Sequence, residues 1–433
     1  LHLSIRRQRQ MCIRDRAYVE LGWGGYWAWD PVENASLMPW LTATAFLHSL
    51  MVQERTGLLK LWNVVLVSLT FLLSILGTFI TRSGLISSVH AFSNTGLGKP
   101  FLFFMLLILL GCFLLITYRW PLFQETLPRR SFFSREGVFL FNNWILVGLM
   151  VTVLWGTLYP MFSEWFAGKR LEVGAPFYNQ ITGPMLWILL LLTGIGPLFR
   201  WGDTSWAVLK KELRFPVMVS VLGLVLLWVY GIHNFSALLG YTGALFLLSA
   251  VAEEFYRGIR ARRKLQKESV WKAFQMLFRK NARRYGGFLV HLGVGVMAIG
   301  IVASQVFKVE KDVNLRPGES VPFMHRTFQY EKLEQKSTPN YVEVRAVLNV
   351  SQRGKTRQLF PARRIYAGSA EQSSSETAIW VTFAGDYYLV LSGWTEEEMA
   401  SFRFTYNPLI SWIWIGAILM FLGGILILWF RKE

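Results

Sequence analysis

The sequence predicts an all-α polytopic membrane protein with a small β-rich domain before its last helix, and three observations predict this fold class. First, the 433 residues are 53% hydrophobic and only 17% charged, with 33 Phe and 19 Trp, which excludes an ordinary soluble domain. Second, long uncharged apolar runs recur, each close to the roughly 20 residues that one helix needs to cross a bilayer. Third, lysine and arginine collect in alternate loops between these runs.

About nine apolar runs are present, and we expect each of them to form one transmembrane helix. They lie near residues 35–53, 60–80, 100–118, 141–160, 182–199, 215–231, 234–252, 285–306 and 408–430. One topology accommodates all nine crossings, with the C-terminal tail in the cytoplasm.

The net charge of +18 follows the positive-inside rule and not the pattern of a nucleic-acid-binding protein. The clearest basic loop spans residues 257–284, and smaller basic groups surround Arg129 and Lys210. These loops are predicted to be cytoplasmic, and membrane lipid is the predicted partner instead of nucleic acid. The segments predicted on the opposite side are 17–34, 81–99, 161–181 and 307–407.

Only two cysteines, Cys12 and Cys112, are present, so neither a disulfide framework nor a cysteine metal site is predicted. No Cys-x-x-Cys-His motif occurs, so the chain is not itself a c-type cytochrome. The first sixteen residues, LHLSIRRQRQMCIRDR, are too basic for a secretory signal peptide. They resemble translated adapter sequence, and we expect a non-native leader over residues 1–16, with the native protein beginning upstream.

We expect a transmembrane domain over residues 17–306 and a final helix with a cytoplasmic tail over 408–433. Residues 307–407 differ from both, because they are polar and contain alternating runs such as YVEVRAVLNV and TAIWVTFAGDYYLVLSG. Alternation of this kind is typical of half-buried strands. The segment is therefore predicted to be a small β-rich domain that serves in docking or packing, without chemistry of its own.

Residues 22–40, GWGGYWAWDPVENASLMPW, combine large flat rings with flexible glycines at a predicted membrane boundary. Aromatic residues concentrate at bilayer interfaces, which explains one or two of these rings but not all of them. Because Pro31 ends any preceding helix, we expect a shaped loop here, followed by a helix that Asn34 or Ser36 caps. On the residues alone, a site for a flat aromatic ligand and a plain interfacial shelf remain equal alternatives.

Two histidines lie within predicted spans, His48 in the first and His291 in the eighth, each near the cytoplasmic end. They should therefore lie at similar depth, where they could supply both axial nitrogens of a haem b. The alternative is that neighbouring helices satisfy both imidazoles. His90, in the outer loop TRSGLISSVHAF, reads on its own as a solvated residue.

The string WGGYWAWDPVENASLMPW resembles the signature of the haem-handling family named for its WWD motif. The large late outer domain is similar to that of the CcmF branch, the haem lyase subunit of cytochrome c maturation. This resemblance covers the chain from Ala17 to its end. A homologue dedicated to nitrite-reductase cytochromes shares the same features.

The resemblance implies specific ligand-binding residues. Trp23, Trp27, Trp29 and Asp30 would line a haem platform; His48 and His291 would ligate an intramembrane haem b; and His90 would ligate the haem in transit at the WWD segment. The second outer ligand is expected before that segment, where this sequence has no counterpart. Arg82 could pair with a haem propionate, or it is a snorkelling arginine at a span end. No catalytic acid or base is assigned.

The function that the resemblance implies is that of a haem lyase subunit, an enzyme as part of a holocytochrome c synthase complex. It would receive haem from a haem chaperone and support thioether attachment to apocytochrome c together with other maturation subunits. The inner haem b would serve reduction. The implied location is the bacterial inner membrane, with the WWD segment, the His90 loop and residues 307–407 in the periplasm.

Two other functions remain open on the sequence. One is a transmembrane transporter of haem or another aromatic solute, although the inverted repeats and paired broken helices of many transporters are not visible in the sequence. The other is a haem-binding assembly scaffold without turnover.

Overall fold

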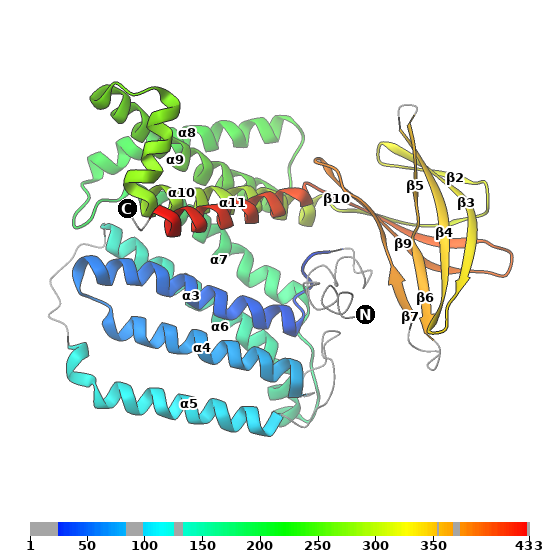
Figure 1. Ribbon diagram of the computed structural model, residues 1–433, viewed down its shortest axis with the longest axis horizontal. Helices are drawn as coiled ribbons and strands as arrows, with labels where there is room; N and C mark the ends of the chain where they lie inside the picture. The colour runs from blue at the N-terminus through cyan, green and yellow to red at the C-terminus, as the bar shows by residue number, and fades with distance from the viewer. Residues whose placement is uncertain (1–24, 84–97, 125–132, 353–354, 367–372, 431–433) are drawn as a thin grey trace. The chain divides into compact units, whose positions relative to one another are not determined.

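The computed structural model describes residues 25–83, 98–124, 133–352, 355–366 and 373–430 (Figure 1). Within these ranges, nine helices are long and apolar enough to cross a membrane, and ten strands precede the last of them. The predicted fold class is confirmed. The suspected leader over residues 1–16 lies outside the described ranges. The described residues form two compact units, one within 27–223 and 245–265, and the other within 25–26, 224–244 and 266–430.

The first unit is a series of neighbouring helices. Its members are α3 (Pro31–Thr56), α4 (Lys60–Ser83), α5 (Gly98–Tyr118), η2 (Trp120–Phe123), α6 (Arg135–Ala167), α7 (Ala175–Ile195) and η3 (Gly196–Leu198), with parts of α8 (Trp206–Val229) and α9 (Phe235–Gln266). Helix α5 packs on α4, α4 on α3, α3 on α6, and α6 on α7 (Figure 1). The core lies between α3, α4 and α6, where Met38, Leu66 and Leu146 are buried.

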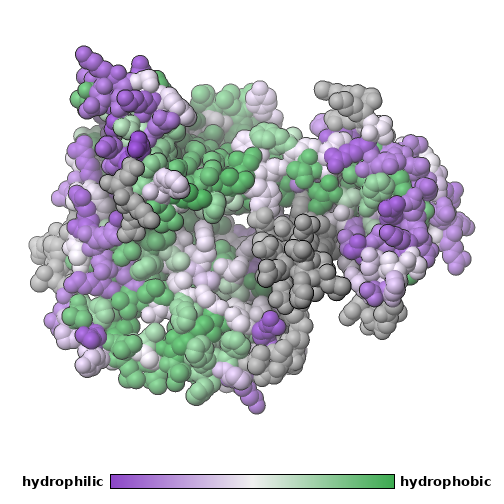
Figure 2. Space-filling view, in the orientation of Figure 1, coloured by the Kyte–Doolittle hydropathy of each residue, from purple (hydrophilic) through white to green (hydrophobic). Residues whose placement is uncertain are grey.

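The outer surfaces of the helices are apolar. Helix α5 has no buried residue, and Phe103 and Leu115 on it are 69% and 65% exposed. Figure 2 shows hydrophobic surface along the helices and mainly hydrophilic surface on the strand domain. Such an apolar surface is far larger than the patches that soluble monomers expose. The chain is therefore a membrane protein whose helices contact lipid.

Several helices extend beyond the predicted apolar runs. Helix α6 begins at Arg135 instead of residue 141, and α10 (Val270–Val306) begins fifteen residues before the predicted 285. Asn281, with φ −141° and ψ 51°, interrupts α10 between its basic part and its apolar part. Hydropathy detects only the turns that lie in hydrocarbon, whereas polar turns extend these helices beyond it.

The ten strands form a sandwich of two antiparallel sheets. They are β1 (Val309–Leu315), β2 (Ser320–Phe323), β3 (Arg326–Ser337), β4 (Tyr341–Gln352), β5 (Lys355–Leu359), β6 (Ala362–Tyr366), β7 (Ser373–Glu376), β8 (Ala378–Trp380), β9 (Gly385–Trp394) and β10 (Ala400–Pro408). One sheet has the order β1-β10-β9-β8 and the other β2-β3-β4-β6-β7, with β5 paired to β4. Alternate side chains such as Phe328, Tyr330 and Phe402 point inward and form the core.

The sandwich is inserted between two packed helices, α10 and α11 (Ile410–Trp429) (Figure 1). Helix α10 leads into β1 and β10 leads into α11, and these two strands pair with Val309 opposite Tyr406. Leu409, in the left-handed conformation with φ 52°, makes the joint between β10 and α11. Two neighbouring strands thus continue into two neighbouring helices.

Helices α10 and α11 meet along a glycine seam, formed by Gly286, Gly293, Gly300, Gly416 and Gly423. A Cβ atom on Gly293 would lie 2.5 Å from the carbonyl oxygen of Gly416, and one on Gly423 would lie 2.7 Å from that of Gly286. Only glycine permits backbones to approach so closely. His291 precedes Gly293 by two residues, about 200° around the helix, and therefore lies on the side of α10 away from α11.

One surface ion pair predicts a pH-dependent stability of the sandwich. Arg403 Nε donates to Asp312 Oδ1 at 2.9 Å, and this hydrogen bond lowers the pKa of Asp312. A carboxyl with a depressed folded-state pKa stabilises the fold above its unfolded pKa of about 3.9, and this contribution is lost as the pH falls through the folded value. Because the two side chains are 52% and 68% exposed, we expect Arg403→Gln to cost at most about 1 kcal/mol at pH 7.

The measurement is thermal unfolding of wild type and Arg403→Gln in detergent at pH 7 and below pH 3. The difference between the two proteins should become smaller at the lower pH, because the contribution of the ion pair is lost as the pH falls through the lowered folded-state pKa of Asp312. A difference of the same size at both pH values would contradict the assignment.

Candidate functional site

The WWD segment enters helix α3 through a capping box. Asp30 is the N-cap, and its Oδ2 accepts a hydrogen bond from the backbone N–H of Val32 at 2.9 Å. The Glu33 carboxylate accepts from the backbone N–H groups of Ala28 at 2.9 Å and of Asp30 at 3.3 Å. Pro31 occupies the first helical position, where no N–H is needed. Asp30 therefore shapes the loop, and its contact with haem stays a prediction.

The prediction that Asn34 or Ser36 caps this helix is wrong, because the helix already begins at Pro31. Asn34 instead links two helices, since its Nδ2 donates to the Trp29 carbonyl at 3.2 Å and to Thr157 Oγ1 on α6 at 3.0 Å. It is fully buried. The first turn of α3 is thereby joined to α6 below the tryptophans.

Trp29 is held in a strained backbone conformation with φ 59°, which costs about 1–3 kcal/mol for a residue with a side chain. Its indole stacks on the Tyr178 ring, with centroids 4.7 Å apart and planes 7° from parallel. Its Nε1 donates to Asn179 Oδ1 at 2.9 Å. Stacking and this hydrogen bond together stabilise by about 1–3 kcal/mol, which is enough to offset the strain.

Tyr178 is itself fixed by helix α6. The residue is 2% exposed, and the side chains of Thr157 and Asn34, which are hydrogen-bonded to each other, lie beside its hydroxyl. A Cβ atom on Gly156 would lie 2.7 Å from Cζ of Tyr178. The Trp29 platform, defined as Trp29, Tyr178, Asn179, Gly156 and Thr157, thus draws on the loop before α3, on α6 and on α7.

Apart from Trp29, no member of this platform was identified from the sequence. The signal that could have found it was the polar and aromatic pair Tyr178–Asn179 at the start of an apolar helix, near its predicted outer end.

Trp27 lies edge-on to Trp29, with ring centroids 5.7 Å apart and planes at 89°. Its Nε1 is buried and has no hydrogen-bond partner in the described part of the chain. Buried polar groups normally have partners, so this N–H is a donor that a ligand with an acceptor would satisfy. Flat rings with such a donor beside them fit a planar molecule with carboxylates at its edge, and haem is one.

Tyr26, the residue before this pair, belongs to the other compact unit. It packs against a cluster of Tyr388, Val390, Ile410 and Ile413 at the junction of the sandwich with α11. Its hydroxyl accepts a hydrogen bond from Gln305 Nε2 at 3.5 Å, and burial raises the pKa of Tyr26. Tyr26 is therefore anchored within this unit.

His48 lies on α3, with its Nδ1 2.8 Å from the carbonyl oxygen of Thr44. A carbonyl can only accept, so Nδ1 carries a proton, and in the neutral ring Nε2 holds the lone pair. Metal-ligating histidines commonly donate their other ring N–H in this way. His48 therefore fits an axial ligand of haem iron.

The remaining predicted site residues are placed as follows. His291 is half-buried on α10, in a different compact unit from His48, so their pairing stays a prediction. Arg82 lies exposed in the last turn of α4, and its contact with a propionate likewise stays a prediction. Trp23 and His90 lie outside the described residues.

Two family models match the chain in the regions just described. The first, cytochrome c assembly protein, matches residues 16–90, which include the WWD segment and His48. The second, the CcmF C-terminal beta-sandwich, matches residues 306–408. These ranges agree with the predicted WWD signature and with the strand domain.

Curated relatives cover nearly all of the chain. The cytochrome c-type biogenesis protein CcmF of Pseudomonas aeruginosa PAO1 is 37% identical over 95% of this chain and 61% of its own length. CcmF of Escherichia coli K12 is 35% identical over 96% of this chain and 63% of its own length. The cytochrome c-type biogenesis protein NrfE of Haemophilus influenzae is 34% identical over 94% of this chain and 62% of its own length.

A solved structure named cytochrome c heme lyase CcmF is similar to the whole fold. It aligns with a TM-score of 0.72 and 30% identity, over 96% of this chain and 62% of that one. The chain thus spans less than two thirds of the length of these relatives. On its helices, its sandwich and its WWD segment, the chain belongs to the CcmF-type family of cytochrome c assembly proteins.

Proposed function

We propose that this chain presents haem for covalent attachment to apocytochrome c, as part of a haem lyase on the periplasmic face of a bacterial inner membrane. The observation that carries the proposal is the Trp29 platform. A strained aromatic residue that three helices hold in place is typical of a binding site, because strain persists only where the surroundings overdetermine it.

The chain's own residues bind and orient in this proposal. Trp27 and Trp29 would contact the macrocycle, the Trp27 N–H and Arg82 would bind its carboxylates, and Asp30 keeps the loop in shape. Trp23 and His90 complete the outer site. When bound, haem supplies the vinyl groups that react with cysteine thiols, so the protein's part is positioning. A haem chaperone, apocytochrome c and other maturation subunits are the proposed partners.

A second haem, of the b type, is proposed inside the membrane with His48 and His291 as axial ligands. The hydrogen bond from His48 Nδ1 to the Thr44 carbonyl supports this role, because it orients Nε2 as the ligating atom. Two neutral imidazoles suit low-spin haem iron. When bound between these histidines, such a haem would supply redox chemistry for reduction.

The test is the absorption spectrum of the detergent-purified chain, oxidised and dithionite-reduced, with a pyridine haemochrome assay. We expect a low-spin six-coordinate haem b that either His48→Ala or His291→Ala abolishes. His233→Ala and His325→Ala serve as controls, since both of these histidines are exposed. The assignment is wrong if no haem co-purifies, or if both intramembrane variants keep the wild-type spectrum.

A further inference from the structure

The β-sandwich carries an arginine–tryptophan site, defined as Arg326, Arg357, Trp380 and Tyr387. The guanidinium carbon of Arg326 lies 3.4 Å from the centroid of the Trp380 ring and 4.5 Å from that of Tyr387. The guanidinium carbon of Arg357 lies 5.3 Å from the same Trp380 ring. The two rings belong to paired positions of β8 and β9, whereas the arginines come from β3 and β5 of the other sheet.

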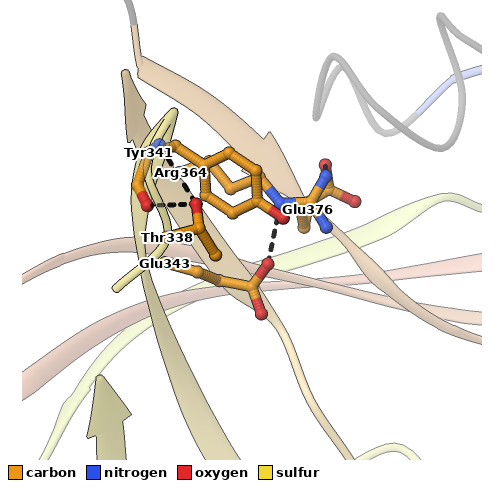
Figure 3. Close-up of polar contacts among 5 residues, drawn as sticks. All are labelled: Thr338, Tyr341, Glu343, Arg364 and Glu376. Carbon is orange, nitrogen blue, oxygen red and sulfur yellow. Dashed lines mark hydrogen bonds and ion pairs between the residues drawn. The ribbon is translucent and has the colours of Figure 1, made fainter. Parts of the chain in front are cut away.

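Two other arginines of the sandwich lie over an aromatic ring and also have carboxylate partners. Arg364 lies over the Tyr341 ring and also pairs with Glu343 at 2.7 Å and Glu376 at 2.5 Å (Figure 3). Arg345 lies over Phe360 and pairs with Glu334 at 2.5 Å. In both cases the ring faces the cation while carboxylates occupy its N–H groups.

Arg326 and Arg357 lie near aromatic rings but have no carboxylate partner among the described residues. Nε and Nη1 of Arg326 are buried, and no hydrogen-bond partner for them occurs among the described residues. Neither arginine has an ion pair within the same part of the chain. Two positive charges therefore share one indole, and neither has an ion-pair partner among the described residues.

This arrangement has a physical cost that a ligand would remove. An aromatic face attracts a cation, but it leaves the N–H donors in the guanidinium plane unused. A buried charged donor without a partner destabilises the fold, and the two like charges repel each other. A carboxylate can accept two parallel N–H bonds from one guanidinium.

We propose that the arginine–tryptophan site binds the carboxylate of an apolar or aromatic ligand. Solvent reaches the site, since Arg326 and Trp380 are half-buried and Arg357 is exposed. The exposed part of the Trp380 ring, together with the exposed apolar side chains of Val381 and Phe383 one and three residues later in the chain (63% and 67% exposed), leaves apolar surface at this end of β8. Such a carboxylate belongs either to a porphyrin or to a polypeptide. The site lies in the sandwich and does not depend on the proposed haem ligands.

The experiment uses the full chain in detergent and 4-fluorobenzoate as the probe, observed by ¹⁹F NMR line broadening. The neutral analogue 4-fluorobenzamide measures adventitious contact with protein and detergent. We expect broadening of the acid alone, and at least a tenfold weaker dissociation constant for Arg326→Gln and for Arg357→Gln. Arg345→Gln is the matched control, because that arginine is stacked but already paired, and it should bind like wild type.

Equal broadening of acid and amide, or wild-type binding by both Arg326→Gln and Arg357→Gln, would overturn the proposal and leave a purely structural stack. Arg357 is exposed, so its variant should fold even if the Arg326 variant does not, and thermal unfolding checks both.

Competition then identifies the source of the carboxylate. Displacement by an iron-free porphyrin diacid but not its dimethyl ester indicates a porphyrin, whereas displacement by a peptide acid but not its amide indicates a polypeptide. Failure of both competitors contradicts the site.

Discussion

Gly293→Ala is expected to destabilise the packing of α10 on α11 by about 1–3 kcal/mol, the usual cost of an overpacked contact. The added methyl group would lie 2.5 Å from the Gly416 carbonyl oxygen and 2.9 Å from the backbone nitrogen of Met420. These are backbone atoms, which cannot turn aside as the end of a side chain can. The helices would have to separate along the whole seam.

Neighbouring glycines provide matched controls for this prediction. A Cβ atom on Gly287, on the same helix, would meet nothing within 4 Å, so Gly287→Ala should be neutral or slightly stabilising. The same contrast holds on α11 between Gly423, which faces Gly286, and Gly424, which faces open space. The measurement is the midpoint of unfolding by sodium dodecyl sulfate in mixed micelles. If all four variants unfold at one midpoint, the seam does not stabilise the helix pair.

Gly156→Ala is expected to displace the Tyr178 ring and so to release Trp29 from its strained conformation. The new methyl group would lie 2.7 Å from both Cζ and the hydroxyl oxygen of Tyr178. Without the stacked ring, Trp29 loses about 1 kcal/mol of stabilisation, and the strain of its φ of 59° is no longer offset. We expect at least tenfold weaker haem binding at the outer site, together with faster amide exchange in residues 27–34.

Gly148→Ala is the matched control, because it lies on the same helix and its methyl group would meet only the flexible end of Met185, at 2.9 Å. Amide exchange reports on the platform without haem, so the structural claim can be tested even if the haem proposal fails. Unchanged exchange in Gly156→Ala would show that Tyr178 does not hold Trp29. Faster exchange with unchanged haem affinity would separate the platform from haem binding.

The membrane architecture could be predicted from the sequence because hydropathy and charge are local properties. Each span is an uninterrupted apolar run, and alternation in residues 307–407 marks strands without any knowledge of their partners. Helix ends were harder to predict from the sequence. Helix α10, for example, has a basic extension before its apolar part and a break at Asn281. The seven-residue spacing of Gly286, Gly293 and Gly300 was visible in the sequence, but only the structure shows that it faces α11.

The candidate site could be predicted only in part from the sequence, because its residues lie far apart along the chain. The WWD segment was recognised as a whole, yet its cap is Asp30 and not Asn34 or Ser36, because local signals do not rank adjacent capping residues. Tyr178 and Asn179 lie about 150 positions from Trp29, and Arg326 lies far along the chain from Trp380. Contacts of this kind depend on how helices and sheets pack, which no local pattern encodes.

The nine spans of the described residues, the strand domain, the aromatic segment and the two histidines within spans can all be read from consecutive residues, so they were predictable without a structure. The stacking of Trp29 on Tyr178, the glycine contact between α10 and α11, and the position of Arg326 over Trp380 without a carboxylate among the described residues became visible only in the folded chain. Binding geometry arises where distant segments pack together, and packing selects among arrangements that the same hydropathy pattern would allow.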